Sequence, residues 1–170
     1  MINIAGLDKN DFVNGDGVCV SLFLQGCPFH CQGCHNPETW NPMGGEERHE
    51  KVLIYEIIEA IAANGIQRNL SILGGEPIDT DEKREFLTSL ILEVKKYYPN
   101  IKIFMWTGYQ YEDIKNDENL QYILDNLDIL IDGPFELEER DITLWLRGSR
   151  NQRVIDMKST RERNEVIVYV

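Results

Sequence analysis

Residues 18–34 read VCVSLFLQGCPFHCQGC, an apolar run followed by three closely spaced cysteines. The apolar residues 18–24 are predicted to form a buried strand that ends at Gln25-Gly26. Residues 27–45 are rich in Pro, Gly, Asn and His, a composition typical of a long loop. The cysteines are therefore predicted to lie in a loop at the carboxyl end of a strand.

The three loop cysteines, Cys27, Cys31 and Cys34, have the spacing Cys-x3-Cys-x2-Cys, which suits a single metal centre. Thiolates are soft ligands for zinc or iron–sulfur clusters. A four-iron cluster normally takes four thiolates, so three would leave one iron open to another ligand. The same cysteines with His30 or His35 would also complete a zinc site. The spacing alone leaves both alternatives open.

Apolar runs and helical patterns alternate along the rest of the chain. Strands are predicted at residues 70–73, 101–106, 129–132 and 166–170, and helices at 51–63, 81–98, 111–116 and 120–127. Such alternation is typical of βα units with a mostly parallel sheet. A complete TIM barrel usually needs about 250 residues. We therefore expect residues 1–170 to form one α/β domain, a partial and open TIM-like barrel or an open sheet.

Three further strand ends carry residues suited to ligand binding, and active sites of parallel α/β folds gather at this edge. The turn Gly74-Gly75-Glu76 exposes backbone polar groups and adds a carboxylate, so it is a candidate for binding an amino-acid-like ligand. A plain turn is the alternative. Thr107 and Asp132 are candidates for contact with a ribose or a carboxylate, or they are cap and turn residues.

Composition narrows the possible function classes. The chain has a formal net charge of −12, which argues against a protein that tracks nucleic-acid phosphates. No apolar run is long enough to span a bilayer, and the first residues do not resemble a signal peptide. We expect a cytoplasmic protein, and in a reducing compartment cysteines are more often metal ligands than disulfides. Cys19, inside the predicted strand, is expected to be a buried small apolar residue.

Together, the cysteine spacing and the Gly-Gly-Glu turn resemble the two signatures of radical S-adenosylmethionine (radical SAM) enzymes. Over about residues 15–153 the chain is similar to a narrower family, the activating proteins of anaerobic ribonucleoside-triphosphate reductases. That similarity rests on the blocks QGC (25–27), CHNPETW (34–40), LGGEP (73–77), WTGY (106–109), DGPF (132–135) and LRGSRNQR (146–153).

The resemblance implies a set of binding residues: Cys27, Cys31 and Cys34 for a 4Fe–4S cluster, and Gly33, Cys34, His35, Gly74, Gly75 and Glu76 for S-adenosylmethionine. The strand-end candidates Thr107 and Asp132 are added to the S-adenosylmethionine set. It implies that an electron from the cluster cleaves the cofactor to a 5′-deoxyadenosyl radical, which takes hydrogen from a glycine of the large reductase subunit. A low-potential donor such as flavodoxin would supply the electron. No acid–base residue is required, so no catalytic side chain is named.

One position departs from the family pattern. Many radical SAM enzymes have an aromatic residue before the third cysteine, where this chain has Gly33. The adenine contacts are therefore expected to come from elsewhere, with His35 or a backbone contact as candidates. The arginine-rich residues 147–153 are expected either to contact the partner or the cofactor carboxylate, or to be a solvated basic stretch. Two other functions stay open: a small radical SAM enzyme acting on a small molecule, such as a 7-deazaguanine-type synthase, and a zinc-binding adaptor without enzymatic activity.

Overall fold

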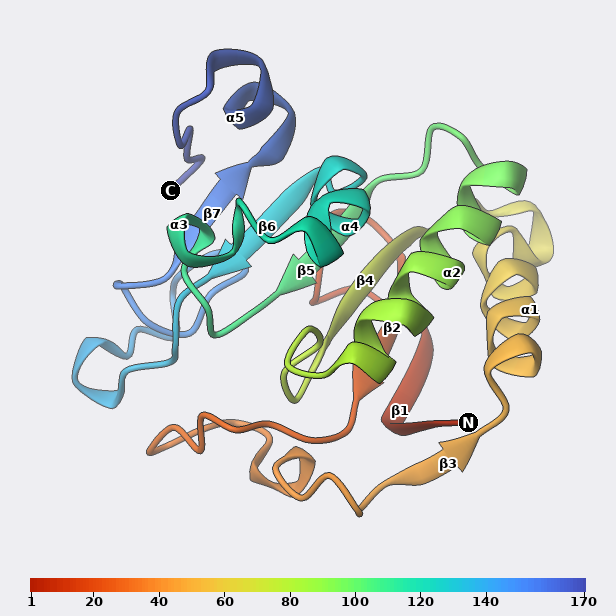
Figure 1. Cartoon of the computed structure of the whole chain (residues 1–170), viewed down its shortest axis with the longest axis horizontal. Coiled ribbons are helices and arrows are strands. Elements are labelled where there is room, and N and C mark those ends of the chain that lie inside the picture. Colours follow the sequence, from red (N-terminus) through yellow and green to blue (C-terminus); the bar gives the residue numbers. More distant parts are fainter.

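Seven strands form one open sheet in the order β3-β1-β2-β4-β5-β6-β7 in the computed structural model, which describes residues 1–170 (Figure 1). The strands are β1 (Ile2–Asp11), β2 (Cys19–Leu24), β3 (Glu46–Arg48), β4 (Asn69–Gly74), β5 (Ile103–Trp106), β6 (Ile129–Asp132) and β7 (Arg153–Asp156). The central strands β2, β4, β5 and β6 are parallel, whereas β1, β3 and β7 pair antiparallel at the two sides. The α/β class with a parallel core is confirmed.

Five α-helices connect or follow these strands. They are α1 (Glu50–Ile61), α2 (Asp81–Tyr97), α3 (Tyr111–Ile114), α4 (Gln121–Asp125) and α5 (Met157–Arg163), with 3-10 turns at Pro37–Thr39, Ala63–Gly65, Glu118–Leu120 and Leu137–Glu139. Thr80 caps α2 by accepting a hydrogen bond from the Lys83 backbone N–H at 3.3 Å. None of these helices combines the length and apolar character that a membrane crossing requires.

The order of the parallel strands places the helices on one face of the sheet. Each new parallel strand adds to the same side of the previous one, and right-handed crossovers then leave every connecting helix on the same face. Helix α1 contacts α2, α2 contacts α4, and α4 contacts α5 (Figure 1). The partial TIM-like barrel stays a prediction, because strand order defines the winding of the sheet and not its curvature.

The core follows the alternation of side chains along each strand. Leu22, Ile72, Met105 and Leu130 belong to a cluster of 30 buried residues that also contains the inner faces of α1 and α2. A second cluster contains Phe104, Ile129, Ile131 and Val154, with Trp106 and Leu146 packed against it. Adjacent strand residues thus point to opposite faces, and the face without the helices is partly apolar as well.

Elements at and near the two edges of the sheet differ from the sequence-based expectations. The predicted strand at residues 166–170 is not a regular strand, although this segment lies beside β7 with an isolated bridge between Val168 and Ile155 and three backbone hydrogen bonds to Val154 and Asp156. The last strand is instead β7, which pairs with β6. Strands β1 and β3 were not predicted, because neither shows a regular two-residue alternation, and pairing with β2 through an irregular register organises β1.

Candidate metal and cofactor site

The cysteine loop begins where β2 ends, and hydrogen bonds close its base. The backbone N–H groups of Gly26 and Cys27 donate to the carbonyls of Thr39 and Trp40 at 2.6 and 3.1 Å. The buried side-chain amide of Gln25 donates to two further carbonyls of the same loop at 2.9 and 2.8 Å. The two ends of the loop are therefore held together by the protein itself.

All four cysteines are free thiols, and three of them are accessible from the loop. Cys27, Cys31 and Cys34 are partly exposed, whereas Cys19 is fully buried inside β2, as predicted. Desolvation raises the pKa of Cys27 and Cys31 above that of a free thiol. No group of three His, Cys, Asp or Glu side chains converges closely enough to hold one metal ion. Three soft donors on one closed loop suit a cluster that binds each thiolate at a different corner.

The Gly-Gly-Glu turn packs directly against the start of the cysteine loop. The N–H of Glu76 donates to the Gly26 carbonyl at 2.9 Å, and the N–H of Gly75 donates to the Leu24 carbonyl at 2.8 Å. A Cβ at Gly75 would lie 2.4 Å from the Gly26 oxygen, so only glycine allows this approach. The Gly75 carbonyl accepts no hydrogen bond from the chain. The turn therefore offers a backbone acceptor beside the first cysteine.

Glu76 joins this turn to the end of β5. Its side chain is 1% exposed and accepts hydrogen bonds from the Thr107 hydroxyl at 2.7 Å and the Gly108 N–H at 2.8 Å. Burial raises the pKa of Glu76 to about 7, against the lowering effect of these hydrogen bonds. Thr107 thus contacts Glu76, and both line the same small cavity.

Asp132 is placed differently from the other candidates. It is buried at the end of β6, where its carboxylate accepts hydrogen bonds from the Arg153 guanidinium at 3.0 Å and the Tyr111 N–H at 2.8 Å. Arg153 also binds Glu112 with two hydrogen bonds, at 2.9 and 2.7 Å. Asp132 lines neither of the cavities beside the cysteine loop. The structure engages its carboxylate in an ion pair and does not bring it to the cofactor candidates.

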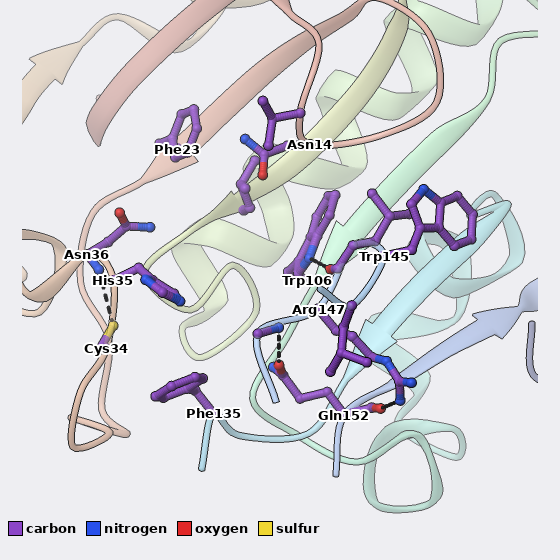
Figure 2. Close-up of a pocket in the computed structure, with 15 residues that line it drawn as sticks. Asn14, Phe23, Cys34, His35, Asn36, Trp106, Phe135, Trp145, Arg147 and Gln152 are labelled. Carbon is purple, nitrogen blue, oxygen red and sulfur yellow. Dashed lines mark hydrogen bonds between the residues drawn. The ribbon is translucent and has the colours of Figure 1, made fainter. Parts of the chain in front are cut away.

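Two adjoining cavities lie at the carboxyl edge of the parallel strands. The smaller, about 120 Å³, lies between Cys27, Cys31 and the Gly75-Glu76 turn. The larger, about 550 Å³, is lined by Cys34 and His35 on one side and by Trp106 and Trp145 on the other (Figure 2). The residues that line both cavities are Trp106, Phe135 and Gln152. The three loop cysteines, His35, Gly75, Glu76 and Thr107 therefore surround one continuous region, whereas Gly33, Gly74 and Asp132 line neither cavity.

Phe135 fills the space beside Gly33 and was not predicted as a site residue. A Cβ at Gly33 would lie 3.3 Å from the Phe135 ring and 2.8 Å from Leu137, and a Cβ at Gly148 would lie 3.1 Å from the same ring. The ring centroids of Phe135 and His35 are 5.4 Å apart. The signals in the sequence were the position of Phe135 directly after a strand-end turn and its place in the block DGPF (132–135). The third-cysteine region thus gains an aromatic neighbour from the end of β6.

Hydrogen bonds within the arginine-rich residues 147–153 hold one side of the larger cavity in place. Arg147 donates to the Gln152 carbonyl at 2.6 Å, and the Gln152 side chain accepts from the Gly148 N–H at 2.9 Å and donates to the Gly133 carbonyl at 3.1 Å. Arg153 pairs with buried Asp132. The guanidinium groups of Arg147 and Arg153 thus have partners within the chain, and the expected contact of this segment with a partner or a cofactor carboxylate stays a prediction.

Comparisons with known proteins agree with this geometry. Residues 13–155 match the family model of a 4Fe-4S single cluster domain. An anaerobic ribonucleoside-triphosphate reductase-activating protein of Enterobacteria phage T4 is 40% identical over 144 residues, 85% of this chain and 87% of the relative. Proteins of the same name from Pasteurella multocida and Escherichia coli K12 are 35% and 33% identical, over 84% and 85% of this chain and 89% and 92% of their own lengths.

Proposed function

Since the chain belongs to the family of anaerobic ribonucleoside-triphosphate reductase-activating proteins, we propose that it activates the large subunit of such a reductase. The observation that carries the proposal is the contact between the cysteine loop and the Gly-Gly-Glu turn, where Cys27, Cys31 and a free backbone acceptor face one cavity and Cys34 lines the adjoining one. The proposal includes a radical SAM mechanism, with a 4Fe–4S cluster and S-adenosylmethionine as cofactors.

The residues present fit these two groups. Cys27, Cys31 and Cys34 would hold the cluster, and the Gly75 carbonyl with the Glu76 carboxyl would receive the ammonium group of the methionine moiety. When bound, the reduced cluster and S-adenosylmethionine would supply a 5′-deoxyadenosyl radical that abstracts hydrogen from a glycine of the reductase. The cofactors supply the hard chemistry, and the protein binds and orients them.

The aromatic side chains beside the third cysteine suggest where the adenine of S-adenosylmethionine would bind. Gly33 and Gly148 leave room for the Phe135 ring, which lines both cavities and packs against His35. Apolar and aromatic surfaces bind the faces of a base by stacking. We therefore assign the adenine to the region between Phe135, His35 and Trp106, where the third cysteine also lies.

The apolar lining of the larger cavity is consistent with a segment of another protein as the substrate. Its lining is mostly apolar and contains no Asp or Glu. Val13 and Trp145, which line it, are exposed, and so are Phe12 and Ile142, which lie near them in the sequence. Exposed apolar residues around a cavity are typical of a surface that binds another protein. The proposal further includes a low-potential electron donor such as flavodoxin and a cytoplasmic location.

The test combines the anaerobically reconstituted protein with S-adenosylmethionine, dithionite and the large reductase subunit. Electron paramagnetic resonance should detect a glycyl radical on the reductase, and a Cys31→Ala variant should give none. Formation of 5′-deoxyadenosine without a glycyl radical would instead support a radical enzyme with a small-molecule substrate. A colourless protein that contains zinc and no acid-labile sulfide would support the adaptor.

A further inference from the structure

Lys83 places a buried ammonium group between the cysteine loop and the Gly-Gly-Glu turn. The residue is 6% exposed, and its Nζ donates to the Gly26 carbonyl at 2.9 Å, the Glu76 carbonyl at 2.8 Å and the Asp79 carboxylate at 2.7 Å. An ammonium group has three donors, and all three are used here. All three N–H donors of Lys83 therefore have acceptors within the protein, unlike those of a solvated surface lysine.

This position is an unfavourable one for a lysine. Lysines are rarely buried, and Lys83 lies in the first turn of α2, where the helix dipole disfavours a cation. Asp79 compensates the charge, and the two carbonyls compensate the lost hydration. Local propensity would place an apolar or acidic residue here, and such departures from local rules are concentrated at functional sites.

The two carbonyl acceptors belong to the two segments that the proposed function assigns to the cofactors. Gly26 directly precedes the first cysteine, and its carbonyl also accepts the Glu76 N–H at 2.9 Å. Glu76 ends the Gly-Gly-Glu turn. Lys83 donates to the Glu76 carbonyl, whereas the Gly75 carbonyl of the same turn accepts no hydrogen bond from the chain.

We propose that Lys83 is a positioning residue that fixes the Gly-Gly-Glu turn relative to the cysteine loop. It thereby sets the separation between the thiolates that would hold the cluster and the backbone acceptor that would hold the S-adenosylmethionine ammonium group. The proposal rests on the proposed function. It assigns Lys83 no contact with either cofactor, so its effect reaches them only through Gly26 and Glu76.

The test compares Lys83→Met with a matched control, Lys96→Met, in the reconstituted protein. Lys96 lies on the same helix but is exposed, with Glu93 as its partner at 2.8 Å. The dissociation constant for S-adenosylmethionine is measured from the change in the paramagnetic resonance spectrum of the reduced cluster. Loss of hydrogen bonds from a charged group predicts that Lys83→Met weakens binding about tenfold or more. Lys96→Met should bind as the unmodified protein does.

Iron and sulfide content and thermal unfolding of each variant separate positioning from a purely structural role. If Lys83→Met holds a full cluster and binds S-adenosylmethionine with unchanged affinity and spectrum, the inference is overturned. If Lys83→Met does not fold, Lys83→Gln decides, because its side chain is shorter and has two N–H donors for three acceptors, so it cannot keep all of these contacts. Weaker binding by Lys83→Gln supports the inference, and unchanged binding overturns it. A reconstituted protein with no spectral response in its unmodified form would contradict the proposed function itself.

Discussion

Glu76 makes the stability of the protein depend on pH. Its pKa rises from 4.5 to about 7 on folding because the side chain is buried, so the folded state favours the protonated form. The stability from this protonation is fully present below pH 4.5 and is lost as the pH rises through about 7. The expected loss is about 3 kcal/mol in the free energy of unfolding.

Urea unfolding of the metal-free protein at about pH 5 and about pH 8 measures this effect. Glu76→Gln cannot ionise, so its unfolding free energy should change less between the two values of pH. Glu93→Gln, on the exposed side of α2, is the control and should keep the full dependence. Equal pH dependence in Glu76→Gln and the unmodified protein would show that Glu76 does not carry it.

The cysteines divide into ligands and a core residue. Cys31 is a partly exposed loop thiol, whereas Cys19 is fully buried in β2. Cys31→Ala is expected to abolish cluster binding, because two thiolates would remain of the three. Cys19→Ala should retain the cluster and lose only about 1 kcal/mol of stability from the smaller side chain. Iron and acid-labile sulfide after anaerobic reconstitution distinguish the two, and loss of iron in Cys19→Ala would contradict the assignment.

Phe135 should contribute to affinity for the adenosyl part of the cofactor. Base stacking on an aromatic ring is worth about 1–3 kcal/mol, so Phe135→Ala should bind S-adenosylmethionine about tenfold more weakly. Binding of S-methylmethionine, which has no adenine, should not change. The control is Leu137→Ala, since Leu137 also borders Gly33 but lines neither cavity. Titration calorimetry that finds equal losses for both ligands would exclude an adenine contact.

At the scale of elements, β6 and β7 are joined by an ion pair that the sequence did not predict. Arg153 on β7 binds buried Asp132 at the end of β6 and also Glu112 near the start of α3. Removing one partner of a buried pair leaves an unpaired charge and costs about 3–5 kcal/mol. Because Arg153 is partly exposed, we expect Arg153→Met to lower the unfolding free energy by about 2 kcal/mol.

Glu112→Gln provides the control for this pair. Glu112 is more exposed than Asp132, so its neutralisation should cost less than about 1 kcal/mol. Chemical denaturation of the metal-free protein gives both values. A similar loss in Glu112→Gln and Arg153→Met would mean that the exposed pair, rather than buried Asp132, stabilises this edge.

The elements with strong periodicity were those that the sequence could predict. Helices α1 and α2 and the central strands β2, β4, β5 and β6 all lie within a few residues of their predicted ranges. Strands β1, β3 and β7 were missed, because each is an edge or next-to-edge strand whose conformation depends on pairing with a distant segment. Local pattern carries no signal for such long-range pairing.

At the scale of the whole molecule, strand ends predicted where the site lies but not how its parts are connected. The cysteine loop, the Gly-Gly-Glu turn and Thr107 meet at the carboxyl edge of the parallel strands, as expected from the sequence. The sequence could not show that the Asp132 carboxylate binds Arg153, or that the Phe135 ring fills the space beside Gly33. Both facts depend on residues that are distant in the chain and become neighbours only in the folded sheet.

The closed base of the cysteine loop has a consequence for how the protein matures. Bringing together the ends of a free loop of about 14 residues costs about 2 kcal/mol of entropy. The bonds from Gly26 and Cys27 to Thr39 and Trp40 meet this cost during folding, without any metal. We therefore expect the base of the loop to close without the cluster, so that the polypeptide folds before the cluster binds. The order of biogenesis would then be the reverse of that in small zinc domains, which fold only as their metal binds.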